Sequence, residues 1–325
     1  MTSPTMSTAT TDHRRAPDPP RRLTTPEELR RWSERCRAAG LTVGLVPTMG
    51  ALHDGHRSLV RRARAECDRV VVSIFVNPRQ FGGAEDINRY PRDVAADIEV
   101  LTAERVDAVF VPSVEVMYPE DAATSVSVRG PLTSILEGAH RPGHLDGVAL
   151  VVAKLLISCR PHRAYFGRKD AQQCSVVRRL ARDLDTGVEI AVCPVVRDVD
   201  GLALSSRNVY LSDEERARAQ AIPRGLAAAA TAFAGGERSS PILRDLVQER
   251  MRAAGFGVDY VELVDEHSFE PVAEARRGCQ ILVAGRMGST RLIDVIRLGI
   301  DEAPLDASDP AESPVPRVTG GQGRD

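Results

Sequence analysis

The sequence lacks the features that would place the protein in a membrane, outside the cell or on nucleic acid. No apolar run reaches the roughly 18 residues that a membrane span needs, and the N-terminus has no apolar core of a signal peptide. The formal net charge of −2 argues against a broad nucleic-acid-binding surface. We therefore expect a cytoplasmic protein with neither a membrane nor a nucleic-acid partner.

The cysteines lack the spacing of a zinc or disulfide framework. There are six, and they form no CxxC pair. Thiols scattered in this way are typical of small buried side chains in a reducing compartment. They are Cys36, Cys67, Cys159, Cys174, Cys193 and Cys279.

The chain is long enough for about two domains, with 325 residues of which 42% are hydrophobic. No internal repeat is visible. Residues 1–20 and 303–325 have little to bury, so we expect disorder at both ends. Between them we expect a first domain over residues 21–196 and a smaller one over residues 197–302.

The first domain alternates short apolar runs with segments of helical spacing. Apolar runs bounded by turn signals predict buried parallel strands. We expect strands at residues 43–46, 70–76, 108–111, 164–166 and 188–192, and helices at residues 58–66, 94–104, 148–158 and 172–184. This order predicts an α/β fold with a doubly wound parallel sheet.

The pattern changes after about residue 196. The capping signature Ser212-Asp213-Glu214-Glu215 predicts one long Ala-rich helix, and residues 241–254 predict another. Three strand-like segments follow, at residues 259–264, 280–284 and 290–296. We expect a small α+β domain with an antiparallel sheet.

The segment VPTMGALHDGH, residues 46–56, leads from the first predicted strand into a helix. His53 and His56 are three residues apart and so share one helix face. A helix N-terminus attracts phosphate, because its first N–H groups lack partners and its dipole is positive there. The segment therefore predicts a nucleotide-phosphate site; the alternative is an ordinary turn with two solvated histidines.

Two further segments suit a small acid. Gln80 follows the second predicted strand, and its amide could bind a carboxylate or a hydroxyl. Arg141, in the loop at residues 137–144, could hold a carboxylate with two hydrogen bonds. Each segment by itself could equally be a strand exit or a surface loop.

Two others suit phosphate. Lys169 and Asp170 open a helix after the fourth strand, and Gln173 shares a face with Asp170. Two hydroxyls and a guanidinium at residues 205–207 make a plausible phosphate cradle. A solvated ion pair and a polar linker are the alternatives.

The location of these groups supports a single site. Ligands of doubly wound sheets bind beyond the carboxyl ends of the strands, so His53, Asn77, Gln80 and Lys169 should converge there. The shared location favours one composite site for ATP and a small acid.

Read together, the motifs resemble the pantothenate synthetase family, also called pantoate–β-alanine ligases. The resemblance covers about residues 22–300. It is carried by residues 47–56, 75–81, 90–92, 117–119, 136–147, 166–173, 197–211, 258–262 and 290–294.

The resemblance implies a Rossmann-like nucleotidylyltransferase domain, with a smaller C-terminal domain that closes over the site in a homodimer. It implies that pantoate reacts with ATP to give pantoyl adenylate and pyrophosphate. The β-alanine amine then displaces AMP to give pantothenate, and Mg²⁺ bridges the phosphates.

The resemblance also implies residue roles. His56 would be the proton donor, and His53, Lys169 and Arg207 would join it in catalysis. The substrate contacts would be Gln80, Gln173, Arg141 and Tyr90. The ATP contacts would be Met49, Gly50, Ala51, Leu52, His53, Asp54, Gly55, His56, Gly167, Arg168, Lys169, Asp170, Val196, Leu204, Ser205, Ser206 and Arg207.

Three positions depart from the family pattern. Arg168 replaces the usual glutamate and adds positive charge beside the ATP contacts, unless its side chain points to solvent. Residues 95–97 read Ala-Ala-Asp where two or three acidic residues are common, which leaves Asp97 as the candidate magnesium ligand. Cys174 replaces an apolar residue, as a small buried thiol can.

Two other functions fit part of the pattern. A different nucleotidylyltransferase could use the same histidines on another acceptor, but a phosphorylated acceptor would need cations where Gln80 and Gln173 stand. A catalytically silent nucleotide-binding protein would not need His53, His56 and Lys169 together.

Overall fold

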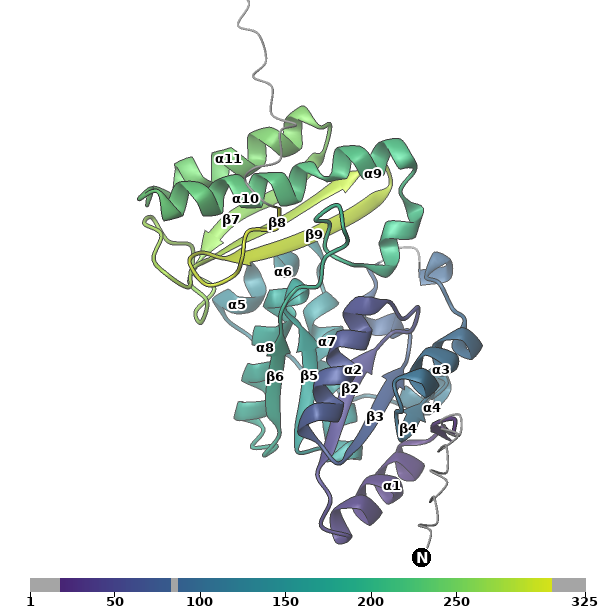
Figure 1. The fold of residues 1–325 in the computed structure, drawn as a ribbon. Coiled ribbons are helices and arrows are strands. Elements are labelled where there is room, and N and C mark those ends of the chain that lie inside the picture. The colour runs from purple at the N-terminus through teal and green to yellow at the C-terminus, as the bar shows by residue number, and fades with distance from the viewer. Residues whose placement is uncertain (1–17, 83–86, 306–325) are drawn as a thin grey trace, which may run out of the picture.

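The computed structural model describes residues 18–82 and 87–305. Most of the predicted disordered ends, residues 1–17 and 306–325, therefore lies outside the described residues. Two sheets organise the rest of the chain, one in each predicted domain (Figure 1). The predicted domain boundary at residues 196–197 falls after the last strand of the first sheet.

The first sheet has six strands in the order β1-β4-β3-β2-β5-β6, and all its pairs are parallel. The five strands expected from apolar runs are confirmed. The edge strand β1 was missed because it is three residues long and reads Arg-Arg-Leu. The strands are β1 Arg21–Leu23, β2 Val43–Thr48, β3 Arg69–Ile74, β4 Ala108–Phe110, β5 Arg163–Gly167 and β6 Glu189–Cys193.

Helices cover both faces of this sheet, which confirms the doubly wound prediction. Leu29 of α1 and Val148 of α7 belong to the core on one face, and Leu59 of α2 and Leu101 of α3 to the core on the other. The helices are α1 Pro26–Ala38, α2 Asp54–Glu66, α3 Val94–Ala103, α7 His144–Cys159 and α8 Ala171–Asp183.

A long connection between β4 and α7 holds three one-turn helices. They are α4 Val114–Met117, α5 Pro131–Ser134 and α6 Glu137–His140. Helix α7 begins at His144, four residues earlier than expected, directly after Gly143 in a left-handed conformation. This brings His144 into the helix N-terminus beside the 137–141 segment.

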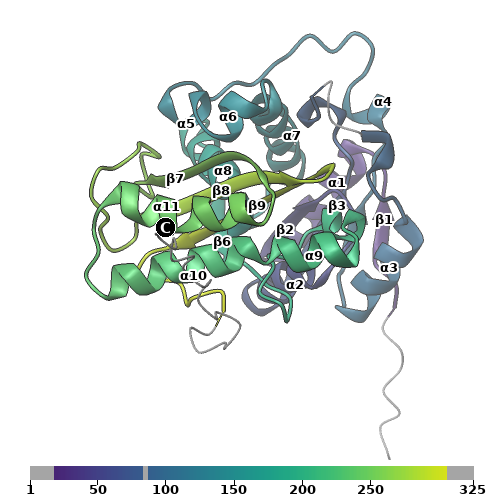
Figure 2. The same ribbon diagram turned by 90° about the horizontal axis from the view of Figure 1, so that it is seen from above.

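The second sheet is antiparallel, as predicted, in the order β7-β8-β9. It is formed by β7 Gly257–Val264, β8 Gln280–Met287 and β9 Thr290–Arg297. Two helices, α10 Ala221–Ala234 and α11 Ser240–Ala253, lie across one face of this sheet (Figure 2).

The prediction of a single long helix after Ser212 is wrong. The structure has α9 Asp213–Ala219 and then α10, with a break at Gln220. Pro223 explains the break, because a proline has no N–H to donate to the carbonyl four residues earlier and its ring clashes with that carbonyl.

The second face of the small sheet packs on the first domain. Along β8, Ile281 and Val283 point into the core under α10 and α11. Leu282 points the other way, where it joins Val295, Leu145 and Ala149 in a separate core. This alternation has the period of two that a strand dictates. The small sheet is therefore fixed over the connection and helices that follow β4 and β5.

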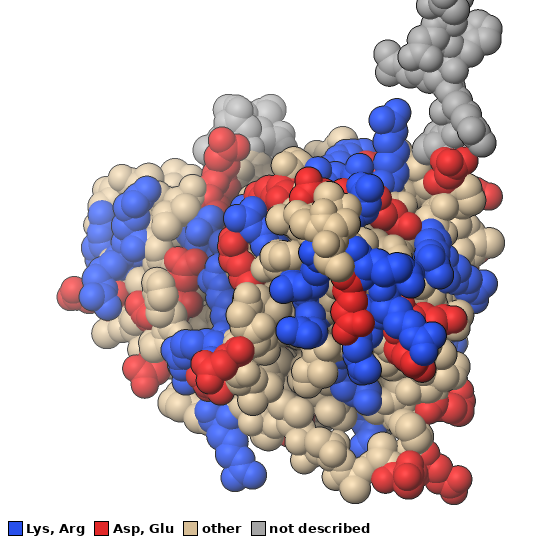
Figure 3. Space-filling view, turned by 90° about the horizontal axis from the view of Figure 1, so that it is seen from below, with Lys and Arg blue, Asp and Glu red and all other residues tan. Residues whose placement is uncertain are grey.

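The outer surface carries charges of both signs. Lys and Arg side chains are interspersed with Asp and Glu over the face seen in Figure 3. Within residues 18–82 and 87–305, no helix has both the length and the apolar character to cross a bilayer.

Candidate active site

Two adjoining cavities lie between the carboxyl ends of the parallel strands and the second sheet. They have volumes of about 210 and 370 Å³. His53, Asn77, Gln80 and Lys169 all line the smaller one, which confirms that the groups after different strands converge. The cavities share Phe81, Tyr90, Arg141, Lys169, Asp170, Ser205 and Arg207, so they form one continuous cleft.

His53 and His56 cap the helix that they open. The His53 ring Nδ1 accepts the N–H of Gly55 at 3.2 Å, and the His56 Nδ1 accepts the N–H of His53 at 3.3 Å. Because each Nδ1 is an acceptor, each neutral ring carries its proton on Nε2. The centroids of the two rings are 4.1 Å apart, and the ring planes are tilted by 38°. The pair therefore offers two Nε2–H donors side by side.

The glycine between the histidines is required by close packing. A Cβ at Gly55 would lie 2.9 Å from Cε1 and Nδ1 of the His53 ring. Any larger residue would push that ring away from the helix N-terminus. The pattern His-Asp-Gly-His thus combines two imidazoles with the space that one of them needs.

Both imidazoles are neutral near pH 7. Burial and the Lys169 ammonium lower the pKa of His53 to about 4. Burial, His53 and Lys169 lower the pKa of His56 to about 3. The positive charge at this wall therefore comes from Lys169 and Arg207, while the histidines act as neutral hydrogen-bond donors until a polyanion binds.

These lowered pKa values predict acid sensitivity. Between pH 6.5 and about 4 the unfolded chain protonates both histidines and the folded chain does not, so the free energy of unfolding falls as pH falls. We expect the His56→Asn variant to lose less stability than wild type between pH 6.5 and 5, by about 1 kcal/mol per pH unit. Urea unfolding at several pH values measures this. Equal pH slopes in the two proteins would contradict it.

A polar segment from the domain junction, residues 205–207, borders the cleft beside the histidines. Ser205 caps the 3-10 helix η4 Ser206–Tyr210 by accepting the N–H of Arg207 at 3.2 Å. The Ser206 hydroxyl donates to the carbonyl of Ala51 at 3.1 Å, so this segment touches the loop before the histidines. The Arg207 guanidinium lies 6.0 Å from the ring centroid of Tyr90, which lines both cavities.

The opposite side presents amides and apolar groups. Gln80 ends the 3-10 helix η1 Pro78–Gln80, which Asn77 caps. The Asn77 amide donates to Gln80 Oε1 at 2.9 Å, and Gln80 Nε2 donates to the Met49 sulfur at 3.1 Å. Gln173 also lines the cavity, as do apolar side chains from α7 such as Val148. This wall suits a small polar molecule with a hydrocarbon body.

Comparison with known proteins identifies the family. The family model for pantoate-beta-alanine ligase matches residues 21–297. The chain belongs to the pantoate–β-alanine ligase family. The pantothenate synthetase of Thermotoga neapolitana is 51% identical over 278 residues, which cover 85% of this chain and 99% of that protein. The pantothenate synthetase of Rubrobacter xylanophilus is 50% identical over 280 residues, or 84% of this chain and 96% of its own length.

Solved structures of pantoate–β-alanine ligases have the same fold. The pantothenate synthetase of Thermus thermophilus superposes with a TM-score of 0.80 at 48% identity, covering 86% of this chain and 99% of that one. The ligase of Francisella tularensis, complexed with β-γ ATP and β-alanine, gives a TM-score of 0.70 at 31% identity, covering 86% and 97%. These matches confirm the resemblance seen in the motifs and the α/β fold.

Part of the segment assigned to ATP does not line the cleft in this ligase. Met49, His53, Gly55 and His56 line the smaller cavity, together with Gly167, Val196 and Leu204. The intervening residues Gly50, Ala51, Leu52 and Asp54 lie outside the lining of both cavities. Asp54 is exposed and pairs with Arg57 at 3.0 Å, because a first-turn carboxylate reaches the side chain three residues on.

The Arg168 side chain does not point to solvent, and it lines neither cavity. Its side chain is buried, and its guanidinium pairs with Glu266 of the second domain at 3.1 Å. The neighbouring Lys169 turns toward Asp170 instead, with 3.7 Å between Nζ and Oδ2. Successive residues of the short helix η3 Arg168–Asp170 therefore serve the domain contact and the cleft.

Asp97 has a structural contact in place of the expected metal site. Its two carboxylate oxygens accept the N–H groups of Ala51 and Leu52 at 3.0 and 2.8 Å, and it lines neither cavity. Ala51 has φ of 51°, a left-handed conformation that is unfavourable for a residue with a Cβ. Asp97 holds this turn before the histidines, so we correct its assignment from magnesium ligand to support of the loop.

The structure gives specific contacts to two further lining residues: Asn77, which was expected at the site, and His144, which was not singled out. Asn77 holds the Gln80 amide, and His144 lies 2.8 Å from the Gln80 carbonyl through Nδ1. Their positions, directly after a strand and directly after Gly143 at a helix start, were visible in the sequence. This signal found Asn77, and the same attention to a polar residue at a helix start could have found His144.

Proposed function

We propose that this cleft carries out the ATP-dependent condensation of pantoate with β-alanine through a pantoyl-adenylate intermediate. The observation that carries this proposal is the division of the cleft into two walls. One wall presents two imidazole donors, Lys169 and the 205–207 segment; the other presents Gln80, Gln173 and apolar side chains. A triphosphate suits the first wall, and a small hydroxy acid suits the second.

In the first step, a carboxylate oxygen of pantoate attacks the α-phosphorus of ATP. The bond from that phosphorus to the α,β-bridging oxygen breaks, and pyrophosphate leaves with the electron pair. Negative charge grows on the phosphoryl oxygens as this happens. His53, His56, Lys169 and Arg207 donate to that charge, so they stabilise the transition state more than the ground state.

His56 acts here first as a hydrogen-bond donor. A neutral ring with its proton on Nε2 can donate to a phosphoryl oxygen without prior protonation. Bound ATP would raise the pKa of the ring, because an anion favours the charged form. The proton-donor role expected from the family therefore becomes available to His56 when the nucleotide is in place.

In the second step, the neutral amine of β-alanine attacks the acyl carbon of the adenylate. The bond from that carbon to the phosphate oxygen breaks, AMP leaves with the electron pair, and the amine loses one proton to water as the amide forms. Gln80 and Arg141 would position the acids for this attack. The apolar wall from α7 would exclude water, which competes for the same carbon.

The residues present fit a magnesium ion that is bound mainly through phosphates. Mg²⁺ commonly uses one or two protein carboxylates together with substrate oxygens. Among the described residues that line the smaller cavity, Asp170 supplies such a carboxylate. We propose Asp170 as its protein contact; the bound ion would neutralise phosphate charge.

The cellular setting follows from the same proposal. All six thiols are free and five of them are buried, which agrees with a reducing cytoplasm. A homodimer is expected from the family resemblance.

The direct test is AMP release. Purified protein with ATP, Mg²⁺, pantoate and β-alanine should form AMP and pantothenate in equal amounts. With β-alanine omitted, AMP should form only slowly, because the adenylate stays bound and must be hydrolysed by water to release AMP. The control omits pantoate. AMP formation that is independent of pantoate would exclude this ligase activity and favour a different acceptor.

A further inference from the structure

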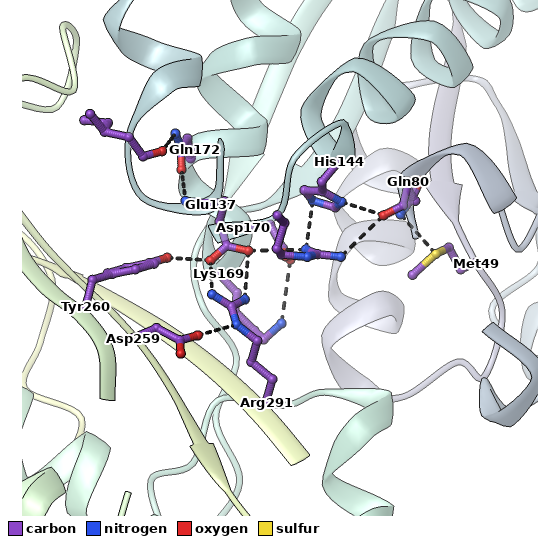
Figure 4. A network of polar contacts seen from close by, with 12 residues as sticks. Met49, Gln80, Glu137, His144, Lys169, Asp170, Gln172, Asp259, Tyr260 and Arg291 are labelled. Carbon is purple, nitrogen blue, oxygen red and sulfur yellow. Dashed lines mark hydrogen bonds and ion pairs between the residues drawn. The ribbon is translucent and has the colours of Figure 1, made fainter. Parts of the chain in front are cut away.

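Two sequence motifs, residues 258–262 and 290–294, have no part in the proposed reaction. They meet at the buried carboxylate of Glu137. Glu137 is 7% exposed and lies at the start of α6. Its two oxygens accept hydrogen bonds from Arg291 at 2.9 and 2.7 Å and from the Tyr260 hydroxyl at 2.7 Å (Figure 4). Tyr260 belongs to β7 and Arg291 to β9, so the second domain supplies these donors.

The same carboxylate also contacts the substrate side of the cleft. Glu137 Oε2 accepts from Arg141 at 3.2 Å. The Arg141 guanidinium lies 3.0 Å from His144 Nε2 and 3.5 Å from the Gln80 carbonyl. Since His144 Nδ1 lies 2.8 Å from that carbonyl, Nδ1 carries the proton and donates, and Nε2 accepts from Arg141. An unbroken chain of contacts thus runs from the second sheet to the main chain of Gln80.

Glu137 is held rigidly at the centre of this chain. The Gln172 side chain accepts the Glu137 N–H at 2.9 Å (Figure 4). It also donates to the carbonyls of Leu132 and Ile135. Burial alone would raise the pKa of Glu137, but the hydrogen bonds and charge of Arg291 hold it at about 2. The group is therefore a fixed anion that requires its cationic partners on both sides.

The arginine of the second domain is itself oriented. Asp259 accepts from Arg291 Nε at 2.7 Å, which leaves the two terminal nitrogens to face Glu137 (Figure 4). Such a two-point contact fixes direction as well as distance. A shift of the second sheet would therefore change the hydrogen bonds that Glu137 accepts.

We infer that Glu137 is a positioning residue that couples the position of the second domain to the acid-binding wall, the side of the cleft that carries Gln80. Arg291 and Tyr260 bind Glu137 from one side, and Arg141 binds it from the other. When the sheet is seated, Arg141 and His144 together hold the Gln80 main chain. When the sheet moves away, Arg141 is the cation that remains paired with Glu137. Glu137 then draws the Arg141 guanidinium away from the Gln80 carbonyl. The acid-binding wall therefore has all its contacts only when the second domain is closed over it. The identity of the acids rests on the proposed function.

The kinetic test uses Glu137→Gln and the milder Tyr260→Phe. We expect both to raise the KM for pantoate and for β-alanine, Glu137→Gln by about tenfold or more, with the KM for ATP within about twofold of wild type. Adding Tyr260→Phe to Glu137→Gln should cause little further change, because its effect passes through Glu137.

Glu266→Gln is the matched control. It also removes the charge of a carboxylate that pairs with an arginine across the two domains, at 3.1 Å, but the arginines that Glu266 pairs with are Arg168 and Arg297. It should leave the KM values for both acids near wild type. Equal increases for all three substrates in Glu137→Gln, or increases for the acids in Glu266→Gln, would show general loosening and overturn the proposal.

Hydrogen exchange separates this inference from the proposed function. The amides of residues 77 and 79–81 should exchange faster in Glu137→Gln than in wild type or Glu266→Gln, whether or not the protein forms AMP. Unchanged exchange there would overturn the coupling. If Glu137→Gln fails to fold, Tyr260→Phe alone decides: higher KM values for the acids with faster exchange support the coupling, and wild-type values for both overturn it.

Discussion

Replacing His56 with asparagine should lower kcat by about 10²-fold or more, while the free energy of unfolding at pH 7 changes by less than about 1 kcal/mol. An asparagine oxygen can take the place of Nδ1 and accept the N–H of His53, so the helix cap is kept. It cannot reach the position of Nε2, so the donor toward the phosphate is lost. Steady-state kinetics and thermal unfolding of the same preparation measure the two effects.

His56→Gln is the complementary variant. Its amide nitrogen can stand near the position of Nε2 and donate, but its side chain no longer caps the helix. If His56 works as a hydrogen-bond donor, this variant should retain more activity than His56→Asn although it is less stable. The opposite order of activities would show that proton transfer, which a glutamine cannot perform, is the dominant role. Near wild-type turnover in both would remove His56 from the mechanism.

Replacing Gly147 with alanine should lower kcat/KM for pantoate by about 10²-fold. The added Cβ would lie 2.0 Å from the Arg79 carbonyl oxygen and 2.7 Å from the Gln80 nitrogen. These are backbone atoms, so the turn that carries Gln80 must move. The Asn77 amide, which donates to the Gly147 carbonyl at 3.1 Å, must move with it.

The same substitution elsewhere provides the control. In a helix, glycine to alanine normally stabilises by about 1 kcal/mol, so a loss of stability in Gly147→Ala must come from the clash. Gly235→Ala adds a Cβ whose nearest neighbours, two carbonyl oxygens, are 3.4 and 3.5 Å away, which is ordinary contact. It should leave kcat/KM unchanged. Wild-type kinetics in Gly147→Ala would mean that the Gln80 turn does not set substrate binding.

Most of the first domain could be predicted because its apolar runs have one physical explanation. Segments such as residues 70–76 cannot be exposed to water and are too short for buried helices, so they form central strands. The edge strand Arg21–Leu23 and the break at Gln220 were missed. The strand depends on backbone pairing that the hydrophobic pattern does not report, whereas the break follows from Pro223, a signal that the sequence contains.

The candidate site could be predicted in outline for a similar reason. Parallel strands bring their carboxyl ends to one edge, so polar residues after different strands must meet there. The surroundings of Arg168 and Asp97 were not predicted, because an isolated charge in a sequence does not indicate its partner. Glu266 lies 98 residues from Arg168, and the amides that Asp97 binds are 45 and 46 residues away.

The sequence by itself determined the fold class, the family and the paired imidazoles at a helix N-terminus, since these follow from local spacing and from motif order. Only the tertiary structure decided which partner each charge found. Glu137 and Arg291 are 154 residues apart, yet they share two hydrogen bonds in a buried contact between the domains. A charge removed from water must find compensation in whatever surrounds it, and that environment exists only after the two domains have packed.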